Sequence, residues 1–299
     1  MRLTILSRSS TIPSTRRMAE AAREKGHQVR ILNPTRVELH LDGRTAAIFY
    51  KRKRLKPPDV VIPRIAASVS SYGLAVVEQF GMRGSLLMNS ARAIGQSRNP
   101  MRCLQLLSAA GVDIPATVMA REAADLKEMV DLVGGVPVLV KLLQGQERRG
   151  VMVCETLQSL EAALEAVLGL GHNLVVQQYV KTRGADVRVF VVGGQALCAV
   201  RRHPRTGRLR RSLTKGARLE KMEMSDSHRA AAEASARLCD LEICAVDMLD
   251  VKGGPKVFEI NSSPGITELE EATGIDLAGA IVARAEQLHA RQRLRAVND

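Results

Sequence analysis

The sequence predicts an α/β protein in which a parallel-sheet domain is followed by α+β segments built from paired strands. Short apolar runs alternate with amphipathic runs over residues 1–95, a pattern typical of β-α-β units with helices on the faces of a parallel sheet. Later apolar runs come in pairs separated by short glycine-containing turns, which indicates antiparallel hairpins. With 299 residues, the chain has the length of two or three domains.

The first predicted domain, residues 1–95, carries the alternating pattern. Strands are predicted at 3–6, 29–32, 59–62 and 86–89, and helices at 14–26 and 71–80. No G-x-G-x-x-G follows the first strand, so the dinucleotide-binding fingerprint is absent.

Residues 96–183 are expected to form a linker helix and a small lid. A helical pattern covers 91–111, and Asn99-Pro100 inside it either starts a new helix or kinks this one. Strands at 136–143 and 151–154 flank the loop 144–150 and make a hairpin flap. A helix at 157–168 and a strand at 174–180 complete a small sheet covered by one helix.

The last predicted domain, residues 184–299, consists mainly of hairpins. Strands at 186–192 and 196–200 flank the turn Gly193-Gly194, and two apolar runs between 244 and 261 flank Gly253-Gly254-Pro255. Helices are predicted at 228–238 and 277–293. The segment from Cys244 to Gly265 is the one around which the functional residues are arranged.

Charge indicates an anionic partner. The net charge is +13 and the pI is near 10, with basic clusters at 51–56, 201–211 and 291–295. A single charge run is usually no more than a solvated surface. Together these clusters predict a field that attracts a nucleotide, a nucleic acid or an acidic protein tail. Aromatic residues make up only 2% of the chain and tryptophan is absent, so stacking platforms for single-stranded nucleic acid are not expected.

Several common site types and locations are not expected. The five cysteines are scattered without a C-x-x-C pair, which predicts buried, reduced thiols, and the six histidines show no H-E-x-x-H spacing for zinc. No apolar run reaches the roughly 18 residues of a membrane span. The N-terminal apolar run is interrupted by Arg8, so no signal peptide is expected and we place the protein in the cytoplasm.

The hairpin between 244 and 261 carries candidate metal ligands. Glu259 and Asn261 are two residues apart, so their side chains project from the same face of a strand, and Asp247 can face them from the partner strand. Two carboxylates and an amide form a hard oxygen set suited to Mg²⁺ bound between protein and phosphates. The alternative is that these are polar side chains on the solvated face of an ordinary hairpin.

Cationic side chains near other strand ends would complement such a metal. Lys141 precedes a glycine-bounded loop and can hold phosphate oxygens, unless it is an ordinary surface lysine. Arg188, Arg201, Arg202 and Arg211 can neutralise a reacting phosphate or carboxylate. The combination suits phosphoryl transfer, in which catalysis is mostly positioning and charge neutralisation and no protein nucleophile is required.

A series of short motifs occurs in a characteristic order along essentially the whole chain. They are Ile62-Pro-Arg-Ile65, Gly134-Gly-Val-Pro-Val-Leu-Val-Lys141, Asp186-Val-Arg188, Arg211-Ser212, Ala245-Val-Asp247, Phe258-Glu-Ile-Asn-Ser-Ser-Pro-Gly265 and Thr273-Gly-Ile-Asp-Leu-Ala-Gly279. With these motifs the sequence resembles the RimK family of ATP-grasp ligases, and within it the enzymes that add glutamate to the carboxyl terminus of a ribosomal protein.

The resemblance implies an N-terminal α/β domain, a central lid and a C-terminal ATP-grasp sheet, with ATP held between the last two. It implies ATP and Mg²⁺ (or Mn²⁺) as cofactors, and it implies an amino acid, glutamate in this family, and an acidic protein C-terminus as substrates. ATP would phosphorylate the peptide carboxylate, and the amine of the amino acid would attack the acyl phosphate. It also implies a homo-oligomer.

The resemblance further implies roles for individual residues. Lys141 would contact ATP phosphate, and Gln178 and Tyr179 would line the adenine pocket. Asp186 would reach the ribose region, and Arg211 the phosphates or the acyl phosphate. The residues implied to bind metal or substrate are Arg64, Asp247, Glu259, Asn261, Ser263 and Gly265.

The chain departs from the family pattern around the nucleotide. Asn99-Pro100 replaces Asp-Lys, residues 146–149 replace a Gly-rich stretch, and Gln178 and Leu213 replace an acidic hinge residue and an asparagine. Each lost charge-assisted contact costs about 1.5–3 kcal/mol, so two or three together would weaken ATP use by about 10²-fold or more.

Two hypotheses accommodate these departures. In the first, Arg148 and Arg149 supply the missing positive charge and the chain is a working ligase with altered substrates. In the second, the chain is a degenerate ATP-grasp protein that binds an acidic partner without ligating it. Nucleic-acid binding is a third possibility, which a steep salt dependence would reveal.

Overall fold

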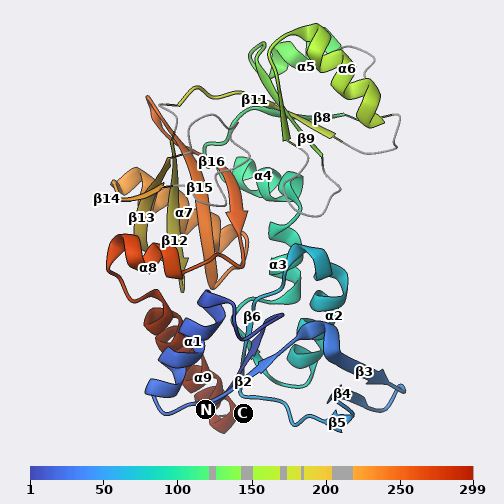
Figure 1. Cartoon of the computed structure of the whole chain (residues 1–299), viewed down its shortest axis with the longest axis vertical. Coiled ribbons are helices and arrows are strands. Elements are labelled where there is room, and N and C mark those ends of the chain that lie inside the picture. The colour runs from blue at the N-terminus through green and yellow to red at the C-terminus, as the bar shows by residue number, and fades with distance from the viewer. Residues whose placement is uncertain (121–125, 143–150, 169–173, 183–184, 204–217, 299) are drawn as a thin grey trace.

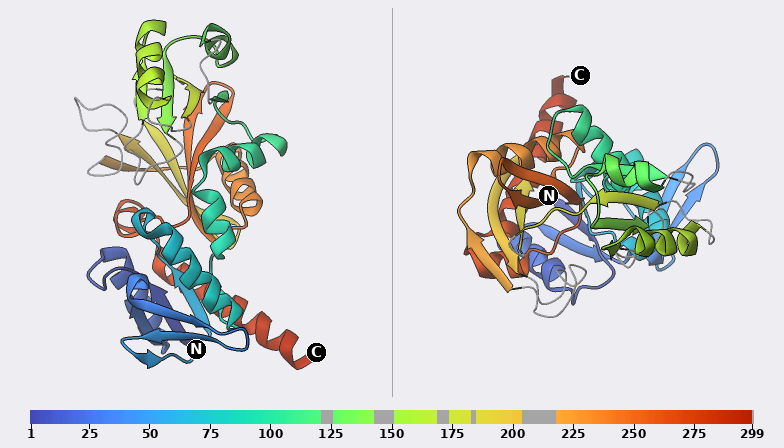
Figure 2. Two further views of the ribbon diagram at one scale, coloured as in Figure 1. Left: turned by 90° about the vertical axis from the view of Figure 1, so that its right-hand side faces the viewer. Right: turned by 90° about the horizontal axis from the view of Figure 1, so that it is seen from above.

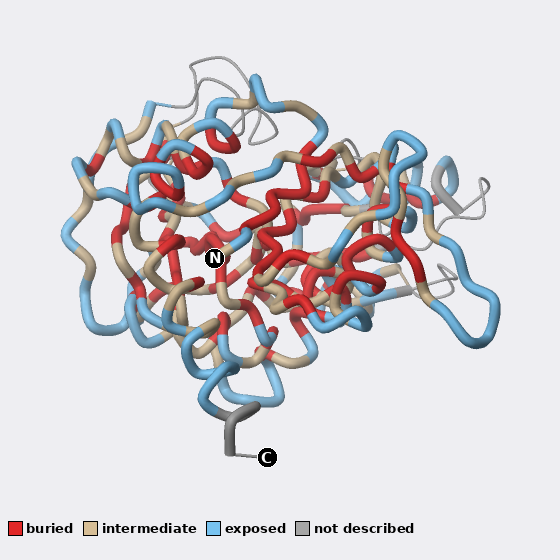
Figure 3. Tube along the Cα trace, turned by 90° about the horizontal axis from the view of Figure 1, so that it is seen from below, coloured by how far each residue is buried: buried red, intermediate tan, exposed pale blue. Residues whose placement is uncertain are grey.

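The computed structural model describes residues 1–120, 126–142, 151–168, 174–182, 185–203 and 218–298. Four β-sheets organise this part of the chain. The lid sheet lies at one end of the molecule, the N-terminal sheet at the other, and a five-stranded sheet between them (Figures 1 and 2). Buried segments run through the interior, while turns are mostly exposed (Figure 3).

The N-terminal domain is built on a parallel sheet, as the alternating pattern predicts. Its strand order is β2 (Gln28–Leu32), β1 (Arg2–Leu6), β6 (Val60–Pro63) and β7 (Leu86–Leu87), and every neighbouring pair is parallel. Helix α1 (Pro13–Glu24) packs with Leu3 and Ile5 of β1, while α2 (Ser70–Met82) packs with Leu6. The sheet is therefore covered on both faces, because alternate residues of β1 point to opposite sides.

A small antiparallel sheet in this domain escaped the sequence prediction. It consists of β3 (Val37–Leu41), β4 (Ala46–Tyr50) and β5 (Lys53–Arg54), and lies between the short 3₁₀ turns at 34–36 and 67–69 in the sequence. The predicted strand at 86–89 ends at Leu87, because Asn89 instead makes an isolated bridge with Leu241. In β3 the apolar residues Val37, Leu39 and Leu41 alternate with polar ones, a strand signal that the prediction did not use, whereas the charge run 51–56 masks only β5.

The linker contains two helices, α3 (Ala91–Ser97) and α4 (Pro100–Ala109). The Asn99 side chain accepts a hydrogen bond from the Arg102 backbone N–H at 3.2 Å, and Pro100 occupies the first helical turn. Asn99-Pro100 therefore starts a new helix, in keeping with the preferences of asparagine and proline at helix N-termini. After α4 the Asp113 carbonyl accepts from Val257 N–H at 2.8 Å, which attaches the linker to the C-terminal sheet.

The lid is a four-stranded antiparallel sheet covered by helices. Its strand order is β10 (Val151–Cys154), β9 (Val138–Leu142), β11 (Leu174–Gln178) and β8 (Thr117–Ala120), with helices α5 (Leu126–Leu132) and α6 (Leu157–Leu168). Val140, Leu160, Leu164 and Val176 form its core. The predicted strands and the helix at 157–168 are present, and the predicted flap loop 144–150 lies outside the described residues.

The C-terminal sheet is antiparallel throughout. Its order is β14 (Arg218–Met222), β13 (Gln195–His203), β12 (Asp186–Val192), β15 (Ile243–Val251) and β16 (Gly254–Asn261). Helix α7 (Asp226–Leu238) packs on one face and begins after Ser225, whose hydroxyl caps it. The strand predicted at 196–200 extends to His203, so Arg201 and Arg202 lie on neighbouring positions of β13 with opposite orientations.

The last two helices, α8 (Thr267–Thr273) and α9 (Leu277–Asn298), return to the N-terminal domain. Ile281 and Ala285 of α9 belong to the same buried cluster as Leu3 and Ile5 of β1. Figure 1 shows α9 beside α1. The C-terminal helix therefore completes the core of the first domain.

The cysteines and the helices can each be compared with the sequence prediction. All five cysteines are buried free thiols, as predicted. None of the helices described is both long and apolar enough to span a bilayer.

Candidate active site

A row of charged side chains crosses one face of the five-stranded sheet. Arg188 on β12 lies directly opposite Asp247 on β15, and Asp247 lies directly opposite Glu259 on β16. Asp186 and Arg202 form the next pair, between β12 and β13. Directly opposite residues project to the same face of a sheet. The register thus agrees with the prediction that Asp247 faces Glu259 from the partner strand.

Asp247 is the centre of this row. Its carboxylate is fully buried and accepts hydrogen bonds from Nε and Nη2 of Arg188, each at 2.7 Å, while Nη2 of Arg202 lies 3.0 Å away. The fork of Arg188 matches the two carboxylate oxygens, a strong charge-assisted arrangement. A buried carboxylate without such partners would be very costly.

Arg202 joins Asp247 to a second buried carboxylate. Its Nε donates to Asp186 Oδ1 at 2.5 Å, and both side chains are only 4% exposed. Burial acts to lower the pKa of Arg202, but the carboxylates of Asp247 and Asp186 outweigh it and hold the pKa above its usual value. Asp186 Oδ2 and Arg202 Nη1 are buried and have no hydrogen-bond partner within the described ranges.

The candidate metal ligands are completed at the end of β16. Asn261 Oδ1 accepts from the Ser263 backbone N–H at 2.9 Å, which forms a local turn, and Glu259 is partly buried. The described residues contain no group of three His, Cys, Asp or Glu side chains arranged around a metal. Two carboxylates with an amide nevertheless fit a hard cation such as Mg²⁺, because oxygen atoms are the ligands that such cations prefer.

Two residues of the N-terminal domain hold the turn that follows these ligands. Arg64 Nη1 donates to the Pro264 carbonyl at 2.5 Å, and its Nη2 donates to Ser14 Oγ at 3.0 Å. Burial lowers the pKa of Arg64 to about 10, so the guanidinium remains charged at neutral pH. The side chain predicted to clamp a substrate carboxylate therefore contacts the turn itself.

Asn89 is the second residue of the N-terminal domain that holds this turn, and the sequence analysis did not identify it. Its Nδ2 donates to the carbonyls of Ile243 and Ser262, and its Oδ1 accepts from the N–H groups of Glu242 and Ile243. This buried amide fixes the start of β15 to the end of β16. Its sequence signal was weak: a lone asparagine after a short strand.

The lid places Lys141 close to β16, the strand that carries Glu259 and Asn261. Its Nζ donates to Gln177 Oε1 at 2.6 Å and lies 5.8 Å from the centre of the Phe258 ring, which precedes Glu259. Gln178 ends β11, where its backbone N–H donates to the Ala116 carbonyl at 2.8 Å, and Tyr179 follows it. Lys141, Gln178 and Tyr179 are thus all on the lid, as a nucleotide site between lid and sheet requires.

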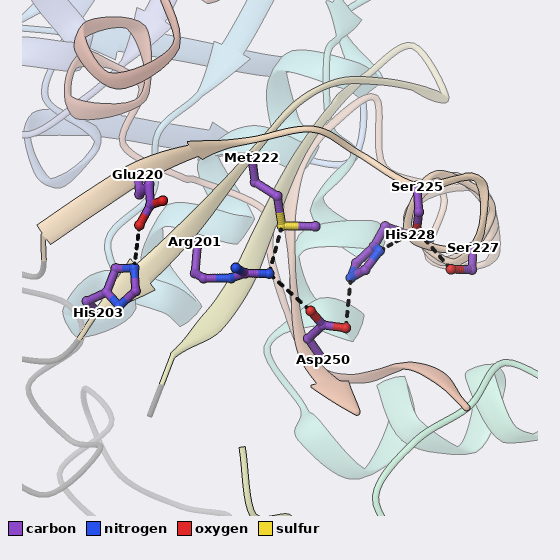
Figure 4. Close-up of polar contacts among 8 residues, drawn as sticks. All are labelled: Arg201, His203, Glu220, Met222, Ser225, Ser227, His228 and Asp250. Atoms are coloured by element: carbon purple, nitrogen blue, oxygen red, sulfur yellow. Dashed lines mark hydrogen bonds and ion pairs between the residues drawn. The ribbon is translucent and has the colours of Figure 1, made fainter. Parts of the chain in front are cut away.

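Arg201 lies on the opposite face of the sheet from Arg202. Its Nη2 donates to Asp250 Oδ2 at 3.2 Å and approaches the Met222 sulfur at 3.8 Å, and His228 Nε2 lies 3.7 Å from Asp250 Oδ1 (Figure 4). The structure does not bring Arg201 together with the row around Asp247. Arg211, Arg148 and Arg149 lie outside the described residues.

Comparison with known proteins shows the family of the chain. The RimK PreATP-grasp domain family matches residues 1–94, and the RimK-like ATP-grasp domain family matches residues 97–285. A protein of Thioalkalivibrio sulfidiphilus named "Probable alpha-L-glutamate ligase" is 41% identical over 288 residues, and one of Methanococcoides burtonii with the same name is 39% identical over 288 residues. In both cases the match covers 96% of this chain and 96% of the relative.

A solved structure shows the same fold. The ATP-grasp ligase PsnB, complexed with a phosphomimetic variant of its minimal precursor, Mg and ADP, superposes with a TM-score of 0.73 at 21% identity. The superposition covers 96% of this chain and 98% of that one. Both parts of the resemblance seen in the sequence, family and fold, are confirmed. The chain belongs to the RimK-like ATP-grasp family and is a ligase.

Proposed function

We propose that this ligase uses ATP and Mg²⁺ (or Mn²⁺) to join glutamate to the carboxyl terminus of an acidic protein or peptide. A ribosomal protein is one acceptor of this class. The observation that carries the proposal is the row Arg188, Asp247 and Glu259, which presents guanidinium and carboxylate groups side by side on one face of the sheet. Lys141 of the lid lies near this row, with its Nζ 5.8 Å from the centre of the ring of Phe258, the residue before Glu259. Positive groups beside negative groups suit a substrate that brings phosphates and a metal ion together.

The cations of the site would neutralise the reacting groups. The acceptor carboxylate attacks the terminal phosphate of ATP, ADP leaves, and the amine of glutamate then displaces phosphate from the acyl phosphate. Arg188 and Arg202 carry positive charge to the face where these anions meet, and Lys141 approaches from the lid. Asp186 would act by holding Arg202, since its carboxylate is already bonded to that side chain.

Asp247, Glu259 and Asn261 would hold the metal. A divalent cation bound there would screen the negative charge of the ATP phosphates. Gln178 and Tyr179 would line the base of the nucleotide at the end of β11. Arg211 stays a candidate for the phosphate contacts, while the place of Arg201 on the other face supports no direct role in the chemistry. A homo-oligomer in the cytoplasm remains our expectation.

The test is a ligation assay with purified protein, ATP, Mg²⁺, glutamate and an acidic peptide that ends in glutamate. We expect ADP and phosphate to form and the peptide mass to rise in steps of one glutamate residue. Replacing glutamate with hydroxylamine should yield a peptide hydroxamate, because hydroxylamine captures an acyl phosphate.

The matched control is the same peptide with an amidated carboxyl terminus, which removes the group that attacks ATP. It should give neither mass increase nor ADP above background. AMP in place of ADP would contradict an acyl phosphate, and an acceptor that never gains mass with any amino acid would contradict the ligation of peptides.

A further inference from the structure

The strongest feature outside the ligase site is the basic hairpin, which we define as residues 50–56 around the β4–β5 turn. Five of the six residues from Lys51 to Lys56 are lysine or arginine, and all five are exposed. Figure 1 shows β4 and β5 at the edge of the N-terminal domain, at the opposite end of the molecule from the lid. The basic hairpin is therefore a surface separate from the candidate active site.

The backbone at the tip has an unusual conformation. Lys51 and Arg52 stand between the paired residues Tyr50 and Lys53, with φ angles of 51° and 62°. Two-residue turns with positive φ at both positions normally carry asparagine or glycine, because a Cβ disfavours this region. The β3–β4 turn of the same sheet uses Gly43, with φ 78°. Strain kept at an exposed tip, in order to present two long cations, indicates a functional use.

The charges of the basic hairpin are uncompensated. Elsewhere in the N-terminal domain, Arg2 pairs with Asp59 and Arg92 with Asp240. None of the five cations of the basic hairpin forms an ion pair with a residue that the structure describes. Asp42, on the same small sheet, directs its carboxylate to the N–H groups of its own turn. Glu38, the other acidic side chain of this sheet, is exposed on β3 and is separated from Arg54 by Phe49 in the register, and it forms no ion pair with the basic hairpin within the described residues.

The basic hairpin is also held firmly at its base. Leu55 N–H donates to the Ile48 carbonyl at 2.8 Å, and Ile48 is buried with Val37 in the core under α2. The tip is therefore presented by an ordered strand pair, and little backbone freedom remains to be lost on binding.

We propose that the basic hairpin docks an acidic polypeptide segment of the acceptor protein. This inference rests on the proposed function, because a carboxyl terminus that receives glutamates becomes a polyanion. Exposed cations without a stacking platform suit carboxylates better than nucleobases, and the one ring at the turn, Tyr50, already lies 6.0 Å from Lys51 Nζ. The docked segment lies upstream of the reacting carboxylate.

The experiment measures binding of a fluorescent α-linked poly-L-glutamate peptide to the full chain by anisotropy, without ATP. Lys51→Gln/Arg52→Gln/Lys53→Gln should weaken binding about tenfold, since exposed ion pairs contribute modestly one by one. The matched control, Arg23→Gln/Arg44→Gln/Arg83→Gln, removes the same net charge from exposed positions elsewhere and should change the affinity less than twofold. Equal losses in the two variants would overturn a specific docking site.

A second variant separates binding from folding. Arg52→Gly relieves the positive-φ strain, so it should raise the melting temperature while weakening poly-L-glutamate binding. Unchanged affinity in this variant and in the triple variant would overturn the proposal. So would a duplex RNA that binds through the same three residues and displaces the peptide, since the surface would then be a nucleic-acid site.

The same design distinguishes this proposal from the ligase proposal. Poly-L-glutamate binding that depends on Lys51, Arg52 and Lys53 would support docking even if no acceptor were ligated. Ligation of a short acidic peptide with no hairpin-dependent binding of the long polymer would support the ligase function and reject docking.

Discussion

The two faces of the C-terminal sheet use the same kinds of residue in opposite ways. On one face Asp247 is completely buried, and Arg188 and Arg202 both reach it. On the other face Asp250 and Arg201 form a single contact at 3.2 Å and are each about 40% exposed (Figure 4). Arg201 and Arg202 are adjacent in sequence, so the alternation of side chains along β13 alone separates a buried charge network from a surface ion pair.

The difference has a physical consequence for each face. Solvent screens the pair of Arg201 and Asp250, and an exposed pair of this kind contributes about 0–1 kcal/mol. The network around Asp247 has been removed from water, so loss of one member leaves its partners with less opposite charge at a site that solvent does not screen. Substitution of a charged residue on the buried face should therefore cost much stability, while substitution on the exposed face should cost little.

The largest effect is expected from Asp247→Ala. It leaves Arg188 and Arg202 buried without their central carboxylate, and should lower the free energy of unfolding by about 3–5 kcal/mol. Urea denaturation measures this change. Asp250→Ala on the other face is the matched control and should cost less than about 1 kcal/mol; similar losses for the two aspartates would remove the distinction between the faces.

Next in size is Glu259→Gln, which keeps the shape of the side chain but removes its charge. We expect ATP turnover to fall by about 10²-fold, because a charge-assisted metal contact is lost, with unfolding changed by less than about 1 kcal/mol. Steady-state ADP release at several Mg²⁺ concentrations measures it. Glu220→Gln, on β14, should turn over ATP normally, and wild-type turnover by Glu259→Gln would reject the metal assignment.

A smaller effect is expected from Arg201→Ala. Because this side chain is 41% exposed and contacts Asp250 on the far face, its loss should cost less than about 1 kcal/mol and leave the KM for ATP within about twofold. Thermal unfolding and initial rates provide both values. A large rise in KM would restore Arg201 to the reacting groups that the sequence suggested.

The smallest effect concerns pH. Burial is the main cause that lowers the pKa of His228, Arg201 lowers it further, and Asp250 opposes both. The unfolded chain takes up this proton near pH 6.5 but the folded chain does so only at lower pH, so stability is complete above 6.5 and declines as the pH falls through the folded pKa.

His228→Gln removes this titration. The melting temperature of the wild type should therefore fall more steeply between pH 6.5 and 5 than that of the variant, as differential scanning calorimetry can show. Parallel profiles would mean that burial does not hold His228 in its neutral form.

Local patterns predicted much of the fold and the pairing at the site. The alternation over the first 95 residues led to the parallel sheet, and the Gly-Gly-Pro break led to the hairpin that sets Asp247 opposite Glu259. Asn99-Pro100 left two outcomes open, and the side-chain cap at Asn99 decides for a new helix. The small sheet of β3 to β5 was missed although Val37, Leu39 and Leu41 alternate with polar residues, and the charge run 51–56 masks only β5.

Other features required long-range contacts. The sequence grouped Arg201 with Arg202, and only the extension of β13 to His203 shows that they face opposite sides. Asp186 pairs with Arg202 across 16 positions of the chain, and Asn89 joins β15 to β16 from more than 150 positions away. No local periodicity encodes such pairs, because they depend on where distant strands meet.

The sequence by itself therefore determined the family and the fold class and supplied the candidate residues of the site, since motifs and apolar periodicity are local properties of the chain. Only the tertiary structure decided which charges are buried, which carboxylate each arginine meets, and that the C-terminal helix α9 packs against α1. Burial and pairing arise from the packing of elements far apart in sequence, and the strength of a charge interaction depends on that burial.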